Sequence, residues 1–364
     1  MRILYLAPPL PHCRKFVETF SRDHEVLAVT QFRDRPPGWE WLGTPGRFAR
    51  WIPGFNVPAL RRTIERFKPD LLHAFHLLPT GYLASLSRFR PLVISPMGAD
   101  VYLVGGQISR LGEVLAASPL PLYWHVALRR RFDLAIAECA HVVSRMEWLG
   151  YEPTKLRAIP WGPDCSVFTP DARDEKLREM LLAGSHADTL LISTRTLRAV
   201  YGVDRVIRAL PRIPESVRLV VCGAGPDEPR LRGLARRLDV GARIHWSGAL
   251  TPEEMPRYLA SSDIAISLAR SDTVSVAILE AMACGLPVVV RDVGGTGEFV
   301  TDGESGLLLD DGEPRKAADA VRGLAEVPAK ARRMGAAARE KVRAKADWRE
   351  CSRRIEKEYE KLAP

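Results

Sequence analysis

The stretch that decides the fold is residues 271–289, which read SDTVSVAILEAMACGLPVV. Apolar runs at 264–268 and 288–290 flank it and predict strands that are buried on both faces. Between these runs lie a polar loop and a helix-length segment, which Gly285-Leu286-Pro287 brings to an end. Strand, loop, helix and strand in this order predict one βαβ unit of a parallel sheet. Ligands of such sheets bind at the turn between strand and helix.

The start of this helix is typical of an anion-binding site. The backbone N–H groups of Ser275, Val276 and Ala277 would open the helix. They offer unused donors and the positive end of the helix dipole to an anionic diphosphate. Glu280 lies about 1.5 turns further along, where a carboxylate can hold the two vicinal hydroxyls of a ribose. From the residues alone, an ion pair is the commoner role for a single glutamate on a buried helix.

The same alternation of strands and helices runs through the whole chain. Strand-like apolar runs lie at 71–75, 92–95, 190–194, 218–222, 264–268 and 288–290, with helix-length segments between them. This alternation predicts an α/β protein with parallel sheets and right-handed crossovers. With 364 residues, the chain is long enough for two domains. A polar stretch interrupts this alternation of strands and helices. We therefore place two domains at 1–168 and 169–347, followed by a charged amphipathic helix at 348–364.

Composition and charge argue against several classes of function. The formal net charge is +9, which suits anionic partners. The sequence has no zinc finger and no RNA-recognition motif, and its basic residues are dispersed, so nucleic acid is not an expected partner. The six cysteines are scattered without a CxxC pair, which argues against a zinc site and a disulfide framework and indicates reduced thiols in the cytoplasm.

Targeting signals are also missing from the sequence. No apolar run reaches the roughly 18 residues of a membrane span. Met1 leads directly into a short strand-like run rather than into a signal peptide. We therefore expect a cytoplasmic protein that is soluble or attached to the inner face of the membrane.

The stretch 271–289, with Gly294-Gly295 after it, resembles the acidic pair with seven intervening residues of the family 4 retaining glycosyltransferases. Asp272 stands at the first acidic position, where the family has glutamate, and Glu280 stands at the second. The resemblance covers nearly the whole chain. It implies the GT-B fold, in which two Rossmann-like, doubly wound parallel-sheet domains face each other across a cleft and the C-terminal helix crosses back to the first domain. It also implies that the first domain binds the acceptor and the second binds a nucleotide sugar.

Further residues of the second half match the donor site of this family. Arg195 matches an arginine that binds the donor diphosphate, and a fixed guanidinium stabilises the charge that develops on a leaving diphosphate. Gly223 and Gly225 match a Gly-x-Gly-Pro turn, and Ile244 begins the strand that is expected to touch the nucleobase. The resemblance thus implies that Arg195 and Asp272 are catalytic and that the other residues bind the donor.

The chain departs from the family pattern at two places. Met97 and Gly98 stand where the family commonly has His-Gly. The Lys-Gly-x-Asp pattern of many members reads Tyr201-Gly202-Val203-Asp204 here, so the phosphate-binding lysine is replaced by Tyr201. Arg198, three residues after Arg195, can supply part of the missing charge. These departures keep open the alternative that the chain is a degenerate member of the family, which binds a nucleotide but does not catalyse transfer.

Candidate residues for the acceptor side lie in the first half of the chain. Asp100 follows the strand-like run at 92–95, and we expect it to be catalytic. His12, at the start of the first helix, and His76, after the run at 71–75, are weaker candidates beside Met97. No Asp-x-Asp motif occurs, and transferases of the other main fold use that pair to hold a divalent cation. We therefore expect catalysis without a metal ion or another cofactor.

The leading interpretation is a metal-independent, retaining hexosyltransferase, of the kind used in polysaccharide biosynthesis. It would move a sugar from a UDP- or GDP-sugar onto a glycan, a lipid-linked acceptor or a small molecule. A nucleotide-sugar epimerase or a glycoside phosphorylase on the same fold stays open. The stretch 36–58 is rich in tryptophan and arginine and reads as a long loop, which suggests contact with an anionic membrane. Packing of these tryptophans onto their own domain is the commoner alternative.

Overall fold

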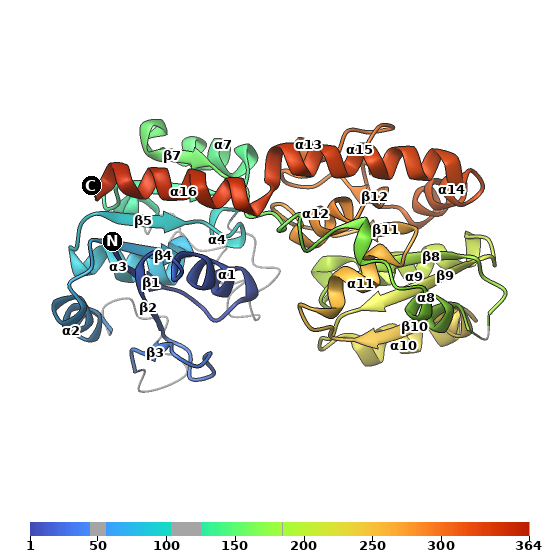
Figure 1. Ribbon diagram of the computed structural model, residues 1–364, viewed down its shortest axis with the longest axis horizontal. Helices are drawn as coiled ribbons and strands as arrows, with labels where there is room; N and C mark the ends of the chain where they lie inside the picture. Colours follow the sequence, from blue (N-terminus) through green and yellow to red (C-terminus); the bar gives the residue numbers. More distant parts are fainter. Residues whose placement is uncertain (44–55, 103–124, 184, 364) are drawn as a thin grey trace. The chain divides into compact units, whose positions relative to one another are not determined.

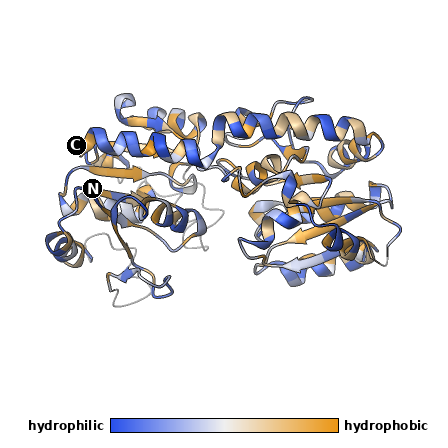
Figure 2. Ribbon diagram, viewed as in Figure 1, coloured by the Kyte–Doolittle hydropathy of each residue, from blue (hydrophilic) through white to orange (hydrophobic). Residues whose placement is uncertain are grey.

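A computed structural model describes residues 1–43, 56–102, 125–183 and 185–363 (Figure 1). The chain divides into two compact units. Unit 1 comprises Met1–Ile159 together with Cys351–Pro364, and unit 2 comprises Pro160–Glu350. Each unit is built on its own parallel sheet, and the strands are largely hydrophobic whereas the helices alternate between hydrophobic and hydrophilic residues (Figure 2).

Within the described residues, unit 1 has a seven-stranded sheet in the order β3-β2-β1-β4-β5-β6-β7. Its strands are β1 (Arg2–Leu6), β2 (Glu25–Thr30), β3 (Glu40–Trp41), β4 (Leu71–Phe75), β5 (Leu92–Ser95), β6 (Leu134–Ala137) and β7 (Leu156–Ala158). Its helices are α1 (Pro11–Phe20), α2 (Val57–Phe67), α3 (Tyr82–Ser87), α4 (Ala99–Tyr102), α7 (Ala140–Trp148) and most of α16 (Trp348–Leu362). The central strands β4 and β5 are buried along their whole length, as expected for a sheet that helices cover on both faces.

Within the described residues, unit 2 has a six-stranded sheet in the order β10-β9-β8-β11-β12-β13. Its strands are β8 (Thr189–Ser193), β9 (Val217–Cys222), β10 (Ile244–Gly248), β11 (Ile264–Ser267), β12 (Val288–Arg291) and β13 (Gly306–Leu309). Its helices are α8 (Glu175–Leu182), α9 (Val203–Ala209), α10 (Glu228–Arg237), α11 (Glu254–Ala260), α12 (Val276–Ala283), α13 (Thr296–Phe299), α14 (Pro314–Ala325) and α15 (Pro328–Ala346). Among these helices, α9 contacts α10 and α14, whereas α12 contacts α11 and α15.

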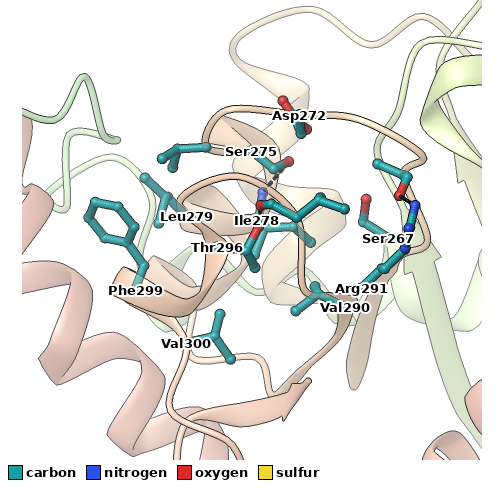
Figure 3. A pocket seen from close by; sticks show the side chains of 13 residues that line it. Ser267, Asp272, Ser275, Ile278, Leu279, Val290, Arg291, Thr296, Phe299 and Val300 are labelled. Atoms are coloured by element: carbon teal, nitrogen blue, oxygen red, sulfur yellow. Dashed lines mark hydrogen bonds between the residues drawn. The ribbon is translucent and has the colours of Figure 1, made fainter. Parts of the chain in front are cut away.

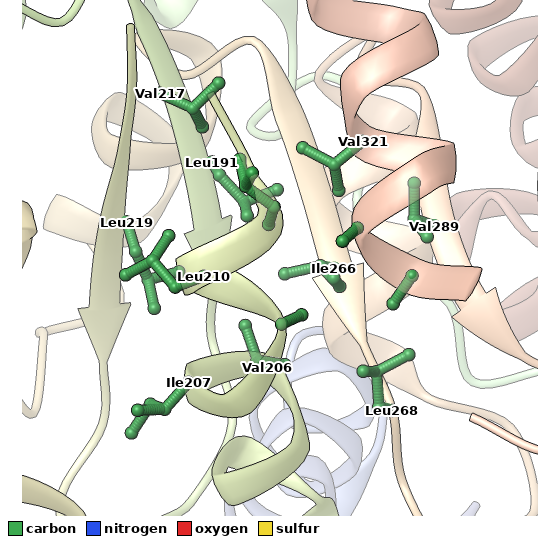
Figure 4. Close-up of a cluster of buried hydrophobic side chains, with 14 of the residues drawn as sticks. Leu191, Val206, Ile207, Leu210, Val217, Leu219, Ile266, Leu268, Val289 and Val321 are labelled. Atoms are coloured by element: carbon green, nitrogen blue, oxygen red, sulfur yellow. The ribbon is translucent and has the colours of Figure 1, made fainter. Parts of the chain in front are cut away.

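The core of unit 2 lies between its sheet and the helices α9 and α14 (Figure 4). Aliphatic side chains of four neighbouring strands meet those of the two helices there; they are Leu191, Leu219, Ile266 and Val289 from the strands and Val206, Ile207 and Val321 from the helices. Burial of one such side chain stabilises the fold by roughly 1.5–3 kcal/mol. Because these side chains pack closely, the loops at the ends of the strands start from fixed positions.

Both sheets are doubly wound. β1 pairs with β2 on one side and β4 on the other, and β8 pairs in the same way with β9 and β11. The strand order therefore reverses between β1 and β4 in unit 1 and between β8 and β11 in unit 2. Ligands of doubly wound sheets bind beyond the carboxyl ends of the strands at this switch point. The prediction of two Rossmann-like parallel sheets is confirmed.

Helix α16 completes the core of unit 1 through a buried tyrosine. The hydroxyl oxygen of Tyr359 lies 2.5 Å from Nδ1 of His73 and 3.4 Å from the hydroxyl oxygen of Tyr5. On the other side of the imidazole ring, Nε2 of His73 lies 2.8 Å from Oγ of Ser95. These buried polar groups satisfy one another, so the helix is joined to β1 and β4 by specific contacts as well as by apolar packing.

The boundary between the units lies between Ile159 and Pro160, and not after residue 168. Residues 160–168 belong to unit 2 because its helices hold them. The N–H of Trp348 donates to the carbonyl oxygen of Pro163 at 2.9 Å. Nη1 of Arg339 donates to the carbonyl oxygen of Phe168 at 3.1 Å.

The stretch 36–58 is not a loop throughout, which corrects the expectation from its composition. Glu40–Trp41 forms the edge strand β3, and α2 begins at Val57. Trp39 is only 8% exposed, because its apolar ring packs inward. Residues 44–55, with Trp51 among them, lie outside the described residues. None of the described helices is both long and apolar enough to span a bilayer.

Candidate active site

The loops after β8 and β11 meet at the switch point of unit 2. Arg195 lies just after β8, and Asp272 lies between β11 and α12. Nη2 of Arg195 is 2.6 Å from Oδ2 of Asp272, and Nη1 donates a hydrogen bond to Oγ of Ser275. Because β8 and β11 are neighbours in the sheet, the fold brings together side chains that are 77 and 80 positions apart in the sequence.

Tyr201 packs against the guanidinium of Arg195. Its ring centroid lies 4.3 Å from Cζ of Arg195, within the range of a cation–π attraction. Tyr201 closes the 3₁₀ turn Ala199–Tyr201, in the segment that leads from β8 to α9. Only 7% of Arg195 is exposed, so its remaining N–H donors point in fixed directions. Arg198, by contrast, is exposed.

Helix α12 begins at Val276, with Ser275 as its N-cap. Oγ of Ser275 accepts the N–H of Ile278 at 3.4 Å, as the dashed line in Figure 3 shows. The N–H groups of Val276 and Ala277 lie in the first turn, where a helix offers them no carbonyl oxygen. The site therefore combines an oriented arginine with the positive end of a helix dipole, and both features favour an anion.

Glu280 lies within α12 and is partly buried. Burial, followed by the charge of Glu280, raises the pKa of the Cys284 thiol at the end of the same helix. Nη1 of Arg339 donates to the carbonyl oxygen of Ala283 and so satisfies an acceptor at the C-terminal end. The helix that carries Glu280 is thus capped at one end by Ser275 and at the other by Arg339.

Gly223 and Gly225 pack against the backbone that carries Arg195. A Cβ atom on Gly223 would overlap the carbonyl oxygen of Arg195, and one on Gly225 would overlap that of Leu197. The N–H of Leu197 donates to the carbonyl oxygen of Ala224 at 3.1 Å. The two glycines therefore determine where the Arg195 loop lies. Ile244, at the start of β10, is 6% exposed and its side chain belongs to the core of unit 2.

A small pocket lies next to the loop that carries Asp272 and Ser275 (Figure 3). Apolar side chains of α12, β12 and the α13 segment line most of it, namely Ile278, Leu279, Val290, Phe299 and Val300. Arg291 also lines it, and its Nη1 donates to the carbonyl oxygen of Arg270 at 3.0 Å. The pocket therefore combines a largely apolar wall with an arginine that is bound to the backbone.

An ion pair between Arg270 and Asp204 lies beside the site and was not expected from the sequence. Nη1 and Nη2 of Arg270 lie 2.8 and 2.7 Å from the two carboxylate oxygens of Asp204. Burial acts to raise the pKa of Asp204, but the hydrogen bonds and charge of Arg270 outweigh it and hold this pKa below its ordinary value. The pair joins the start of α9 to the loop after β11. The Gly-x-Asp part of the family pattern was the available signal for it.

In unit 1, Asp100 joins the loops that follow β4 and β5. Oδ1 accepts the N–H of Met97 at 3.0 Å, and Oδ2 accepts the N–H of Leu77 at 2.5 Å. The carboxylate is 5% exposed, and Oδ2 lies 3.9 Å from Nδ1 of the more exposed His76. Gly98 precedes α4, and its carbonyl oxygen accepts the N–H of Val101 at 2.8 Å. The loops after β4 and β5 thus bring together Asp100, His76 and Met97, next to the switch point of unit 1 between β1 and β4.

The histidines at this switch point are neutral near pH 7. Burial lowers the pKa of His76, and the charge of Asp100 opposes that shift. Burial, followed by the charges of His76 and Lys15, lowers the pKa of His12 to about 3. His76 has φ 71° and ψ 141°, in a region that side chains other than glycine rarely enter. In the part of the chain that the structure describes, no group of three or more His, Cys, Asp or Glu side chains is arranged to hold a metal ion.

Both units match models of known families. Residues 12–167 match Glycosyltransferase Family 4, and residues 182–341 match Glycosyl transferases group 1. The D-inositol 3-phosphate glycosyltransferase of Acidothermus cellulolyticus is 30% identical over 336 residues, which are 86% of this chain and 65% of that protein. The GDP-mannose-dependent alpha-(1-6)-phosphatidylinositol monomannoside mannosyltransferase of Mycobacterium tuberculosis is 32% identical over 204 residues, which are 53% of this chain and 52% of that protein.

The chain spans 58 to 65% of the length of the first curated relatives that it matches. A solved structure, that of Anabaena Alr3699/HepE in complex with UDP and glucose, has a TM-score of 0.80 to this chain at 20% identity and covers 100% of both chains. At this identity the likeness shows the fold alone. With two family models on its two units and a GT-B fold along its whole length, this chain belongs to the glycosyltransferases of the family 4 type.

Proposed function

We propose that this chain transfers a sugar from a UDP- or GDP-sugar to an acceptor, with retention of the anomeric configuration and without a metal ion. The observation that carries this proposal is the position of Arg195 beside the N-terminus of α12, at the switch point of unit 2. A buried, oriented guanidinium and free helical N–H groups suit a diphosphate. The relatives support the donor class, since one is named GDP-mannose-dependent and the solved neighbour holds UDP and glucose.

Catalysis in this proposal comes from charge stabilisation at the donor. Negative charge develops on the diphosphate as its bond to the anomeric carbon breaks. Arg195 and the N–H groups of Val276 and Ala277 are oriented before the reaction, so they stabilise this charge without reorganising. Glu280, further along α12, would accept hydrogen bonds from the ribose hydroxyls while the diphosphate lies at the helix start. Gly223, Gly225 and the backbone near Ile244 would complete the donor site.

We assign the acceptor to unit 1, to the loops after β4 and β5 that carry His76 and Asp100, beside the switch point. The unfavourable backbone conformation of His76 supports this assignment, because strain of roughly 1–3 kcal/mol per residue is concentrated at functional sites. A neutral imidazole can both donate and accept a hydrogen bond, which suits a sugar hydroxyl. Asp100 would hold the two loops in place around a glycan, a lipid-linked acceptor or a small molecule, with His12 and Met97 nearby.

A second candidate function is binding of a nucleotide without turnover. Tyr201 stacks on Arg195 where many members of the family carry a lysine, so the site has one positive charge fewer. Hydrolysis of the donor in the absence of acceptor distinguishes the two functions. An enzyme releases nucleoside diphosphate slowly under these conditions, whereas a degenerate binder releases none.

The proposal is tested first by a thermal-shift screen with uridine, guanosine and adenosine diphosphates and their sugars. A ligand at about 100 times its Kd should stabilise the protein by roughly 2.7 kcal/mol. Turnover of the best donor should then continue in excess chelator, and the product should keep the anomeric configuration of the donor. Loss of activity in chelator that manganese or magnesium restores would contradict the metal-free mechanism, and an inverted product would contradict retention.

We further propose that unit 1 contacts an anionic membrane from the cytoplasmic side. Trp148 is 72% exposed, with Cζ of Arg145 4.0 Å from its ring centroid, and Arg130 and Arg131 are exposed as well. Tryptophan favours the membrane interface, and arginine is attracted to anionic lipid. Sedimentation with anionic vesicles should weaken with salt and with Trp148→Ser, but not with the control Val167→Ser in unit 2. Absence of binding at low salt would contradict membrane contact.

A further inference from the structure

Asp272 has both carboxylate oxygens bound inside the protein. Oδ2 lies 2.6 Å from Nη2 of Arg195, and Oδ1 accepts the N–H of Thr273 at 3.0 Å. The side chain of Asp272 is 15% exposed and that of Arg195 is 8% exposed. An ion pair this buried is costly to break, because the arginine would keep its charge without a partner. The carboxylate therefore has a defined partner before any ligand arrives.

The backbones that carry this pair are also closely packed. Gly294 has φ 57°, and a Cβ atom on it would lie 2.6 Å from the carbonyl oxygen of Thr273. The N–H of Gly295 donates to that same oxygen at 2.6 Å. On the other side of the pair, Gly223 and Gly225 pack against the Arg195 loop. Neither loop can move toward a ligand without disturbing a close backbone contact, so the two side chains are aimed by the fold.

We propose that Asp272 is a positioning residue, which holds the Arg195 guanidinium toward the donor diphosphate and does not contact the sugar. This inference rests on the proposed function. Asp272 and Ser275 each take one N–H of the guanidinium, and the ring of Tyr201 packs against it. The guanidinium has five N–H donors, so the others stay available for phosphate oxygens.

The length of the side chain supports this role. The family pattern that the sequence resembles has glutamate at this position, whereas this chain has aspartate, which is one methylene shorter. In the structure, the carboxylate of this shorter side chain contacts Arg195. Turning it toward a sugar would break its bonds to Arg195 and Thr273 and leave the buried guanidinium short of a partner.

Calorimetry with two ligands tests the role directly. The Asp272→Asn variant should bind the nucleoside diphosphate and the corresponding nucleotide sugar more weakly by a similar factor, about 10-fold or more, because both carry the diphosphate that Arg195 meets. A loss confined to the nucleotide sugar would show contact with the sugar and would overturn the inference. If the wild type bound neither ligand, the proposed function itself would fail, so the two failures are distinguishable.

A matched control separates positioning from stability. Asp263, just before β11, pairs with Arg178 at 2.9 Å, so it forms an aspartate–arginine pair at the opposite end of the same strand. Asp263→Asn should lower Tm and leave both affinities of the folded protein unchanged. If Asp263→Asn weakened both ligands as much as Asp272→Asn does, the effect would be one of general stability, and the positioning role would be wrong.

A double-mutant cycle in kcat completes the test. If Asp272 acts through Arg195, the variant that combines Arg195→Ala with Asp272→Asn should turn over within about 3-fold of Arg195→Ala alone, because residues acting as a unit are not additive. If the kcat losses of the two single variants multiplied in the double variant, Asp272 would act on the substrate independently of Arg195. That result would overturn the inference.

Discussion

The ring of Tyr201 lies 4.3 Å from Cζ of Arg195, so the residue that replaces a lysine of the family pattern packs against the arginine next to it. Tyr201 adds no charge to the site. Through the attraction between its ring and the cation, it limits the orientations that the guanidinium can take. Relative to the family pattern, the site thus has one positive charge fewer, while the guanidinium of Arg195 is held more firmly.

Replacing Tyr201 by leucine should therefore lower turnover. The lost cation–π contact is worth about 0.5–2 kcal/mol, which corresponds to roughly 2- to 30-fold in kcat. Tyr201→Phe keeps the ring and should stay near the wild-type value. Steady-state kinetics with saturating donor measure both. Equal losses in the two variants would mean that the hydroxyl, and not the ring, is what matters.

Arg195→Ala should reduce kcat far more than it raises the KM of the donor, because the charge that Arg195 meets develops late in the reaction. A loss of about 10²-fold or more is expected for a residue of this kind. Arg195→Lys should recover only a part of it, since an ammonium lacks the fork that bonds Asp272 and Ser275 together. Near-wild-type turnover of Arg195→Ala would remove this residue from the site.

Glu280→Gln should weaken binding of the free nucleoside diphosphate, because the carboxylate is expected to accept both ribose hydroxyls. Isothermal titration with UDP or GDP gives the change in Kd. If Glu280 served only to stabilise α12, the variant would show a lower Tm with an unchanged affinity per folded molecule. That outcome would contradict the ribose assignment.

Gly225→Ala should disturb the Arg195 loop. The new Cβ would overlap the carbonyl oxygen of Leu197, and such overpacking costs about 1–3 kcal/mol. We expect a lower Tm together with reduced kcat, since the displaced backbone also carries Arg195. Gly241→Ala is the matched control, because a Cβ there meets no atom within 4 Å. Thermal denaturation of the two variants should differ clearly, and equal Tm values would argue against the close contact.

Stability should fall as the pH drops below about 6.5, the pKa of a histidine in the unfolded chain. Burial lowers the pKa of His73 to about 3, so the folded state binds fewer protons than the unfolded state between these two values. The stability is thus fully present above pH 6.5 and is lost as the pH falls toward 3, by about 1.4 kcal/mol per unit for one group.

His73→Gln should make this dependence less steep by about one proton, although it lowers stability at pH 7 by breaking the contact with Tyr359. Denaturant unfolding at several pH values gives the slopes. A slope that is unchanged in His73→Gln would contradict a neutral, buried imidazole.

The local pattern of residues was enough to predict the elements of the candidate site in unit 2. The apolar run at 264–268 and the segment after Ser275 predicted β11 and α12, and the structure has both. Buried strands and capped helices follow from a few neighbouring residues, because hydrophobic period and capping are properties of short segments. The alternation of such segments also predicted parallel sheets, and the resemblance to the family implied that they are doubly wound.

The contacts of the site were decided by the tertiary structure. Nothing near Asp272 in the sequence indicates that its carboxylate bonds Arg195, and nothing near Tyr359 indicates that it reaches His73. Composition left open whether Trp39 packs inward, as it does in the structure, and gave no sign that residues 160–168 are held by unit 2. Such partners come from loops and helices that meet only when the strands take their places in a sheet, so their pairing depends on strand order and close packing rather than on any local signal.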